Sequence, residues 1–532
     1  MRITKPDGEI GGNISMEQSL VLTFDVGTQS ARCLLVNESG GFEDKEQKKY
    51  KVPYLSKQPG WAEQTPDFYF NIIAEMSKKV IERNADKLDR ITAVCLTCIR
   101  DTVLCLDKDK RPLRDIILWL DDREAKVDGQ IPAYKRAIFS LVGMEESVDM
   151  IYRASTGNWI MQNEPEIWAK TDKYVMLPSY LNYLLTGELK DSAANMIGHV
   201  PFDYKNRRWM KPSALTRCVC NVPTEKLCEL VPSGEVIGKI TKEASEKTGI
   251  PEGLPLIATG SDKGCETIGM SVVKSNQAAI SFGTTSTLQM AVKKYFEPQP
   301  YMPAYPAVPN DMYNPEFEVY RGFWMISWFI EQFASKDKVD AAEEGVCVER
   351  FLDDKIKNIE AGSGGLILQP FWTPGITNPS ASGAIIGFSD FHTRYHLYRA
   401  IIEGICMELY HGLDTMQKRS KVTVNELYAG GGGASSPVVC QIAADVFGLP
   451  VHRIQTHEAS AVGCAMVAFL SQGVFDSYED AISHMVHQKD VFMPNEENHR
   501  TYMKIYSKAY SHLAARLRPI EKYLHYFQTG GH

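Results

Sequence analysis

Short apolar runs separated by polar turns dominate the hydrophobic pattern of this chain. The runs are rich in β-branched and aromatic residues and predict strands; they cover residues 21–24, 32–36, 91–99, 256–258 and 280–282. Between them, apolar side chains recur at helical spacing, as in residues 67–83 and 438–447. Strands interleaved with amphipathic helices predict an α/β fold.

Three other segments lack this regular pattern. Residues 38–49 are highly charged, and we expect them to form a surface turn. The periodicity of residues 134–209 predicts helix throughout most of that segment. Residues 1–18 are polar and contain glycines but no apolar core of a signal peptide, so they predict a loose tail.

The first apolar pair encloses the motif Asp25-x-Gly27-Thr28-x-Ser30. Gly27 permits a tight turn and leaves room for a ligand. Thr28 and Ser30 add hydroxyls beside exposed backbone N–H groups, which suits a phosphate. Asp25 ends the first strand, where a carboxylate can hold a metal ion through water. An ordinary β-hairpin explains each of these residues taken singly.

A second hairpin of the same kind strengthens the phosphate interpretation. Gly283-Thr284-Thr285-Ser286 follows the strand at 280–282 and precedes another apolar run, with Gly283 standing 256 residues after Gly27. A device repeated after half the chain predicts two similar domains that face one another across a shared cleft. Each domain would then offer one phosphate-binding turn.

The third ligand signal is a run of four glycines, residues 430–433, directly after a strand. Ser436 and Pro437 follow at the cap and first position of the next predicted helix. Glycines let a flat nucleotide approach the backbone, and the start of a helix favours anions. A merely flexible loop would rarely need four glycines before so well capped a helix.

Two further strand ends carry polar residues, where ligands of α/β proteins bind. Asp262 follows the strand at 256–258 and is placed either as a general base or as the N-cap of the next helix. Arg100 and Asp101 follow the strand at 91–99 and predict contacts with sugar hydroxyls, the alternative being a simple ion pair between neighbours. Trp61, in a Gly/Pro loop, either walls a cleft or packs over a helix start.

Composition limits the class of protein. With 532 residues the chain is too long for one core and predicts two domains. A net charge of −8 without a long basic run argues against nucleic acid and anionic membranes as partners, and no apolar stretch reaches the roughly 18 residues of a membrane span. The 12 cysteines are scattered; Cys95 and Cys98 point to opposite faces of a strand, which argues against zinc and for free thiols in a reducing cytoplasm.

In this order and spacing, the motifs resemble those of the FGGY carbohydrate kinases, which belong to the actin and hexokinase superfamily. The resemblance covers about residues 21–473. It rests on the two hairpins, Pro59-Gly60-Trp61-x-Glu63-Gln64-x-Pro66, Gly260-x-Asp262, Gly383-x-x-x-Gly387 with residues 399–404, and the glycine loop. It implies two actin-like (ribonuclease H-like) domains, residues 19–270 and 271–532, with a nucleotide cleft between them.

The resemblance also implies an ATP- and Mg²⁺-dependent transfer of phosphate to a sugar or polyol, with Asp262 as the base and Asp25 helping to hold Mg²⁺. The residues that it places around ATP and its phosphates are Thr28, Gln29, Ser30, Arg32, Gly283, Thr284, Gly431, Gly432 and Ser435. Those that it places on the side of the acceptor are Trp61, Arg100, Asp101, Asp262 and Lys263. Homodimers are common in this family.

The departures from the family lie on the acceptor side. A segment that supplies a substrate-contacting tyrosine in glycerol kinases is absent between Gly157 and Trp159, Lys263 replaces a glutamine, and residues 373–382 lack the usual Glu-Arg-Thr-Pro run. A polyol or ketose is the expected acceptor, and Lys263 would favour an anionic sugar. Two alternatives stay open: an actin-like ATPase that drives a partner protein, and a non-catalytic sugar-responsive binding protein.

Overall fold

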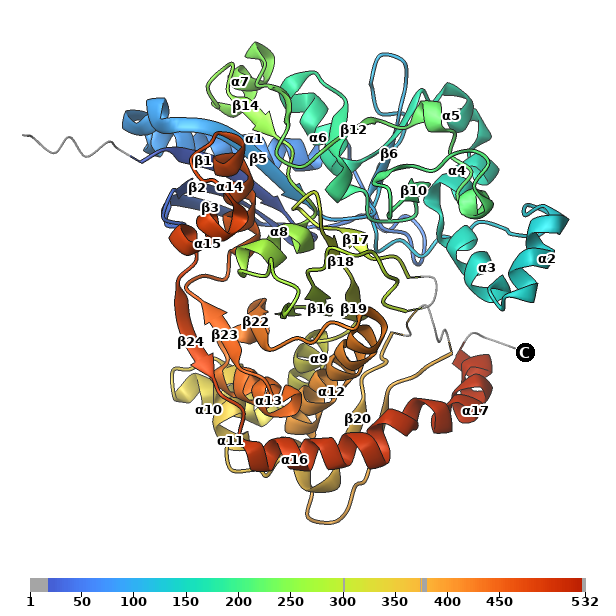
Figure 1. The fold of residues 1–532 in the computed structure, drawn as a ribbon, viewed down its shortest axis with the longest axis vertical. Coiled ribbons are helices and arrows are strands. Elements are labelled where there is room, and N and C mark those ends of the chain that lie inside the picture. The colour runs from blue at the N-terminus through green and yellow to red at the C-terminus, as the bar shows by residue number, and fades with distance from the viewer. Residues whose placement is uncertain (1–17, 300–301, 374, 376–379, 529–532) are drawn as a thin grey trace, which may run out of the picture.

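The structure is a computed structural model and describes residues 18–299, 302–373, 375 and 380–528. Two six-stranded mixed sheets organise the chain (Figure 1). In spatial order the first sheet consists of β13 (Val236–Lys239), β14 (Pro255–Ile257), β5 (Ile91–Cys98), β1 (Leu20–Val26), β2 (Ser30–Asn37) and β3 (Phe42–Lys49). The second consists of β24 (Gln488–Phe492), β23 (Val451–Ile454), β22 (Glu426–Gly430), β15 (Gln277–Phe282), β16 (Ser286–Met290) and β19 (Glu316–Val319).

The two sheets have the same topology. Each has an antiparallel edge pair, then three parallel strands, and then two antiparallel strands that begin with a hairpin. The hairpins are β1–β2, which closes at the pair Val26 and Ala31, and β15–β16, which closes at Phe282 and Ser286. The duplication predicted from the two Gly-Thr turns is therefore confirmed.

Helices cover both faces of the first sheet. One face packs against α1 (Phe68–Arg83) and α6 (Leu177–Thr186), and the other against α8 (Asp262–Gly269) and α14 (Ala459–Ser471). Although α14 comes late in the chain, its Val462 and Cys464 pack with Val21 and Ala93 of the first sheet. The hydrophobic cores thus tie the end of the chain back to its beginning.

The second sheet has its own core on the face away from α8. There β15 and β16 pack beneath α9 (Trp324–Phe333), α12 (Arg394–Ser420) and α13 (Pro437–Phe447). On its other face, Ala279 and Ile454 pack with Met270, just after α8, and with Ala459 at the start of α14. Helices α8 and α14 therefore lie between the two sheets (Figure 1).

The remaining elements surround these two layers. A four-stranded sheet consists of β4 (Glu63–Gln64), β7 (Ile116–Ile117), β6 (Val103–Leu106) and β8 (Lys173–Met176). The N-terminal half also contains α2 (Ala133–Leu141), α3 (Glu145–Ala154), α4 (Thr156–Asn163), α5 (Pro165–Lys170), α7 (Lys242–Thr248), β9 (Lys190–Ser192), β10 (Phe202–Asp203), β11 (Arg208–Trp209) and β12 (Glu229–Val231). The C-terminal half contains β17 (Tyr305–Pro306), β18 (Tyr313–Asn314), α10 (Ser335–Glu343), α11 (Val348–Ile356), β20 (Ile367–Gln369), β21 (Ala384–Ile386), α15 (Tyr478–Met485), α16 (Glu496–Ile505) and α17 (Ser511–Gln528).

One expectation from the hydrophobic pattern is wrong, and a second holds only in part. Residues 42–49 are not a turn but β3, an edge strand whose charged side chains alternate and pair with α1, as Arg83 does with Asp44 and Glu46. Charges of this kind protect an open sheet edge. The segment 134–209 is largely helical up to the end of α6, as predicted, but the rest of it, residues 187–209, is not. Within the helical part, the apolar run 173–176 is β8, because pairing with β6 overrides a pattern too short to separate helix from strand.

The cysteines are structural. Cys95 packs in the core beneath α14, and Cys98 in the core beneath α1, on opposite faces of β5. Of the 12 cysteines, only Cys347 is exposed. Within the described ranges, no group of three His, Cys, Asp or Glu side chains is arranged to hold a metal ion, and no helix there is long and apolar enough to cross a membrane.

Candidate active site

A cavity of about 830 Å³ opens between the two halves of the chain. Residues of the first half and of the second half contribute to its wall, with Thr28, Arg100 and Asp262 on one side and Thr285 and Glu318 on the other. The carboxyl ends of β1, β5 and β14 converge here, because these three strands are parallel neighbours in one sheet. This is where α/β sheets bind ligands.

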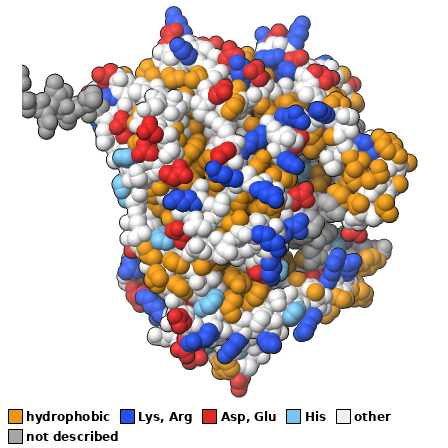
Figure 2. All heavy atoms as spheres, viewed as in Figure 1, with side chains coloured by type: hydrophobic (Ala, Val, Ile, Leu, Met, Phe, Trp, Pro, Cys, Tyr) orange, Lys and Arg blue, Asp and Glu red, His pale blue; other side chains and the backbone are white. Residues whose placement is uncertain are grey.

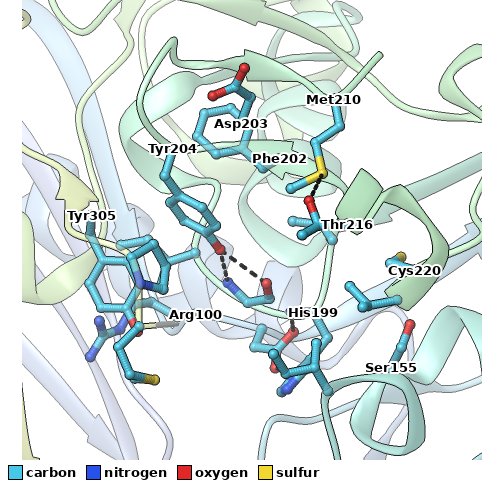
Figure 3. Close-up of a pocket in the computed structure, with 18 of the residues that line it drawn as sticks. Arg100, Ser155, His199, Phe202, Asp203, Tyr204, Met210, Thr216, Cys220 and Tyr305 are labelled. Atoms are coloured by element: carbon cyan, nitrogen blue, oxygen red, sulfur yellow. Dashed lines mark hydrogen bonds and ion pairs between the residues drawn. The ribbon is translucent and has the colours of Figure 1, made fainter. Parts of the chain in front are cut away.

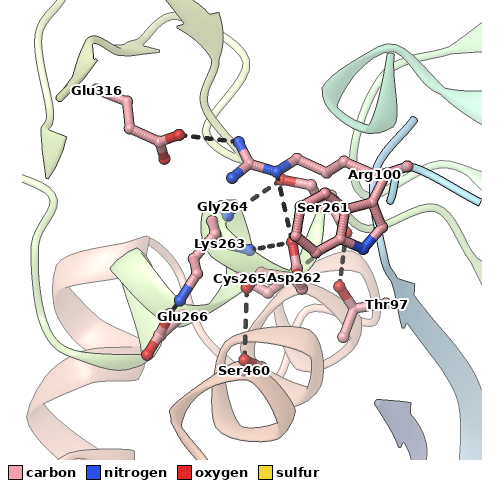
Figure 4. A network of polar contacts seen from close by, with 12 residues as sticks. Thr97, Arg100, Ser261, Asp262, Lys263, Gly264, Cys265, Glu266, Glu316 and Ser460 are labelled. Atoms are coloured by element: carbon pink, nitrogen blue, oxygen red, sulfur yellow. Dashed lines mark hydrogen bonds and ion pairs between the residues drawn. The ribbon is translucent and has the colours of Figure 1, made fainter. Parts of the chain in front are cut away.

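Asp262 is the first residue of α8 and lies in the wall of this cavity (Figure 4). The N-cap is Ser261, whose hydroxyl accepts the N–H of Gly264 at 3.2 Å, so the alternative that Asp262 caps the helix is wrong. The Asp262 carboxylate instead accepts the N–H of Lys263 at 2.8 Å, and its Oδ1 lies 3.8 Å from Nε of Arg100. Its other oxygen stays available to a ligand hydroxyl.

Burial raises the pKa of Asp262, and the positive charges of Arg100 and Lys263 counteract this only in part. The net result is a carboxylate with a pKa above its ordinary value. A base with a raised pKa accepts a proton more readily at neutral pH, as a catalytic carboxylate should. The geometry and the electrostatics of Asp262 therefore both suit proton abstraction.

Asp25 lies at the carboxyl end of β1, where its Oδ2 accepts a hydrogen bond from Nη1 of Arg32 at 3.1 Å. Burial raises its pKa to about 6; Arg32 opposes this, whereas Asp262, Glu458 and Glu266 add to it. A buried carboxylate with other carboxylates nearby suits a hydrated cation. Mg²⁺ usually keeps several waters and binds one or two carboxylates together with substrate phosphates, so a single buried carboxylate fits it.

The turn after β1 is held by its backbone. The N–H of Gly27 donates to the carbonyl of Ser30 at 3.0 Å, and the hydroxyl of Thr28 accepts the indole N–H of Trp119 at 3.0 Å. Gln29 is exposed at the tip of the turn. In the second hairpin, Thr284 holds the corresponding exposed tip, and Gly283 accepts the N–H of Phe323.

The glycine loop packs directly on the second hairpin. Gly431 has a φ of +77°, and a Cβ there would lie 2.8 Å from backbone atoms of Phe282. Only glycine permits both this conformation and this approach. Gly432 and Ser435 are exposed on the loop, where the Ser435 hydroxyl donates to the carbonyl of Gly432 at 2.7 Å.

The helix start that follows this loop agrees with the sequence. Ser436 caps α13 by accepting the N–H of Val439, and Pro437 is the first helical residue, so both predictions are confirmed. The glycine loop therefore leads directly into a capped helix, and through Gly431 it packs against the second hairpin at Phe282.

The side chains of Arg100 and Asp101 bind different partners. The alternative prediction, an ion pair between these two neighbours, is therefore wrong. Arg100 spans the cleft, with Nη1 donating to Glu316 at 3.1 Å (Figure 4). Its Nη2 lies 3.6 Å from Glu318. Asp101 accepts the N–H of His199 at 2.9 Å and contacts its Nδ1 at 2.6 Å. Arg100 thereby connects the carboxyl end of β5 in the first sheet with β19 of the second.

Lys263 and Trp61, both predicted to contact the acceptor, bind other protein groups instead. Nζ of Lys263 donates to Glu266 at 2.7 Å and to Ser281 at 2.8 Å. The carboxylate of Glu266 offsets the positive charge of the ammonium group, so this pairing gives no support to an anionic acceptor. Trp61 packs edge-on against Trp159 and beneath the guanidinium of Arg123, 3.9 Å from the ring centre, whereas the tryptophan found in the described cavity wall is Trp119.

Several residues of the cavity wall had no part in the sequence interpretation. Trp119 precedes polar residues 121–123, which is a usable signal for a strand end. Glu318 lines the cavity and Glu316 pairs with Arg100; the two alternate with apolar residues in β19, an unusual pattern for a buried strand. His199 carries no local signal, because it lies in a segment interpreted as helix. The departure at residues 373–382 falls partly outside the described residues, which exclude 374 and 376–379.

Two related domains, each with a phosphate-type turn, and a buried carboxylate between them define a phosphotransferase of the actin-like fold. The model of the FGGY family of carbohydrate kinases, N-terminal domain, matches residues 20–269, and that of the C-terminal domain matches residues 278–471. The chain therefore belongs to the FGGY family. It is an ATP-dependent carbohydrate kinase.

Individual relatives agree with this assignment. The chain is 26% identical to "Uncharacterized sugar kinase YgcE" of Escherichia coli K12, over 92% of each chain. It is 24% identical to a xylulose kinase of Lactococcus lactis, over 91% of this chain and 95% of the relative. The crystal structure of xylulose kinase from Rhodospirillum rubrum superposes with a TM-score of 0.80 at 23% identity, over 94% of this chain and all of the other. This likeness shows the two-domain fold.

The raised pKa values of the two site carboxylates predict how activity depends on pH. In the roles predicted for them, Asp25, with a pKa of about 6, would bind a cation and Asp262 would accept a proton; each role requires the ionised carboxylate, so protonation of either residue should inactivate the enzyme. We expect kcat/KM for ATP, which reports groups of the free enzyme, to fall as the pH drops through about 6. Rates measured from about pH 5 to 9 at constant ionic strength test this. A profile that stays flat down to about pH 5 would contradict it.

Proposed function

We propose that this enzyme transfers the terminal phosphoryl group of ATP to a hydroxyl of a ketose or polyol bound beside Asp262. The observation that carries the proposal is the position of Asp262, which lies at the start of α8, between Arg100 and Lys263, in a cavity lined by both domains. The acceptor oxygen forms a bond to the terminal phosphorus as the bond from that phosphorus to the bridging oxygen of ADP breaks. The hydroxyl proton passes to Asp262.

The acceptor side of the proposal rests on fixed hydrogen-bonding groups. Arg100 is held by Glu316 and Glu318, so its position is set before an acceptor binds. Asp101 and His199 form a second rigid pair in the same cavity wall. Groups fixed in advance orient a hydroxyl without losing conformational entropy at the moment of reaction.

The phosphate side uses the three glycine turns. In this proposal Thr28, Gln29, Ser30 and Arg32 face the transferring phosphate, and Gly283 and Thr284 bind the ATP phosphates. Gly431, Gly432 and Ser435 would line the adenosine pocket. Exposed turn residues on a rigid backbone support this role, because phosphates bind exposed N–H groups and hydroxyls.

Asp25 would hold Mg²⁺ through water, and the ion would supply positive charge against the phosphates. The residues of this chain would exclude water and align the two reactants as the domains close, which protects ATP from hydrolysis. The eleven buried free thiols support a reducing compartment such as the cytoplasm.

An ATP-consumption screen over polyols, ketoses and sugar acids tests the proposal, and Arg100→Gln sharpens it. We expect the variant to raise KM for the best acceptor by about 10-fold or more, since a charged hydrogen bond is worth about 1.5–3 kcal/mol. KM for ATP should change less than about threefold. Arg83→Gln, an exposed arginine beside Asp44, is the matched control. If KM for ATP rises more than KM for the acceptor, Arg100 does not belong to the acceptor site.

A further inference from the structure

The cavity that holds Asp262 is larger than a simple sugar requires. A cavity of about 150 Å³ accommodates a ring of six carbons, whereas this one measures about 830 Å³. An unmodified pentose or hexose beside a phosphoryl group would leave much of that space to water. The shape and chemistry of the remaining space therefore carry information about the acceptor.

Away from Asp262, apolar side chains make up much of the cavity wall, and Arg208, Lys211 and Ser213 are among the polar residues that also line it. Helix α3 contributes one part of this wall, and β10 and the turn at residues 215–219 contribute the others. We name this region the apolar annex and define it by Val148, Ile151, Phe202, Met210, Val219 and Cys220. Figure 3 shows Met210 and Cys220 on the side of the cavity away from Arg100 and Tyr305.

Two hydroxyl groups beside the annex already have hydrogen-bond partners within the protein. Thr216 Oγ1 donates to the sulfur of Met210 at 3.8 Å, and Ser155 Oγ accepts the N–H of Asn158 at 3.5 Å (Figure 3). Burial raises the pKa of the Cys220 thiol, which keeps it neutral. A sugar hydroxyl placed here would lose water without gaining an equivalent partner, which is unfavourable. An apolar group would instead gain from leaving water.

A fixed polar boundary separates the annex from the reaction centre. His199 is held by Asp101, and Gly198 beside it has a φ of +146°, with a Cβ position only 2.3 Å from Oδ1 of Asp101. Tyr204 donates to the carbonyl of Gly198 at 3.1 Å and closes the loop (Figure 3). A ligand that spans both regions would present hydroxyls up to His199 and an apolar group beyond it.

We propose that the acceptor of this kinase is a polyol or sugar that carries an uncharged alkyl or aryl substituent, and that this substituent occupies the apolar annex. The inference rests on the proposed function, because it assumes that the acceptor hydroxyl lies beside Asp262. It assigns Ile151 and its neighbours in the annex to acceptor specificity rather than to chemistry.

Paired acceptors test the inference with the full-length enzyme. Glycerol and xylitol are each compared with their 1-O-butyl ethers. A buried methylene is worth about 0.8 kcal/mol, or about fourfold, so we expect kcat/KM to be at least about tenfold higher for each ether than for its parent. Ile151→Trp, at a half-buried position facing the annex, should abolish this gain, so that the ratio of kcat/KM for each ether to that for its parent falls to about one. Ile138→Trp, at a 41% exposed position on α2, is the matched control and should retain the gain.

The outcomes separate this inference from the proposed function. If the parents are phosphorylated but the ethers are no better, or if the gain persists in Ile151→Trp, the annex does not bind the acceptor and the kinase assignment is unaffected. If neither parents nor ethers are phosphorylated, the acceptor class of the proposed function is wrong. In that case calorimetric titration of the butyl ethers decides: binding that weakens at least about tenfold in Ile151→Trp, but not in Ile138→Trp, supports the annex, and unchanged or absent binding overturns it.

Discussion

Replacing Asp262 by asparagine should lower kcat by at least about 100-fold, the usual scale for removal of a general base. The amide keeps the size of the side chain and its acceptor oxygen for the N–H of Lys263, but it cannot take up a proton. Because the acceptor and ATP still bind, we expect both KM values to change by less than about threefold. Initial rates with ATP and the best acceptor of the screen measure this effect.

The fold should tolerate this change. Burial raises the pKa of Asp262, so its ionised form is costly in the folded state at neutral pH. Removing that charge relieves the cost, although Arg100 and Lys263 lose part of their compensation. We expect a thermal unfolding midpoint at or near that of the unmodified enzyme.

Asp203→Asn provides the matched control for this experiment. Asp203 also lies in the cavity wall, but its carboxylate accepts hydrogen bonds from Asn206. Its replacement should leave kcat within about threefold. Equal turnover by Asp262→Asn and the unmodified enzyme would remove Asp262 from the role of base.

Gly463→Ala should destabilise the protein by at least about 2 kcal/mol and reduce activity as well. Helices α8 and α14 cross at backbone contact: a Cβ on Gly463 would lie 2.0 Å from the carbonyl oxygen of Cys265, and one on Gly269 would lie 1.9 Å from that of Ala459. Neither carbonyl can yield without moving a helix. Since Asp262 is the first residue of α8, separating the helices displaces the base.

The sign of this effect is diagnostic. In a helix with free space, exchanging glycine for alanine stabilises by up to about 1 kcal/mol. Gly264→Ala is the matched control, because a Cβ there would meet its nearest atoms at 3.4 Å, an ordinary contact distance. Urea unfolding of both variants, with kcat for Gly463→Ala, measures the difference. If the Gly463→Ala protein were as stable as the unmodified one, α8 and α14 would not be in backbone contact at Gly463.

The glycine turns of the site and the start of α13 could be predicted from the sequence. Gly27, Gly283 and the glycines 430–433 mark turns between apolar runs, so these turns could be located and compared. Among these glycines, only Gly431 has a positive φ, a conformation that other residues adopt at a cost. Ser436 and Pro437 predict a helix start, because the N-cap and first helical positions have their own residue preferences. The repeat of one hairpin after 256 residues then implied two related domains, which the matching strand orders confirm.

The hydrogen-bond and ion-pair partners of the polar residues could not be predicted from the sequence. Arg100 and Asp101 are neighbours in the chain, yet one pairs with Glu316 and the other with His199, at separations of 216 and 98 residues. Lys263 follows the base directly, but its ammonium group turns to Glu266 and Ser281. Side-chain direction depends on the whole surroundings and not on sequence spacing.

The sequence by itself determined the fold class and the duplicated hairpins, because these follow from local backbone preferences. It also predicted the class of enzyme, through the resemblance of its motifs to those of the FGGY carbohydrate kinases. Only the tertiary structure decided that α14 returns to the first sheet, that Ser261 rather than Asp262 caps α8, and that the cavity extends into an apolar annex. The physical reason is that packing joins segments hundreds of residues apart. The space between them, which selects the acceptor, has no counterpart in any local pattern.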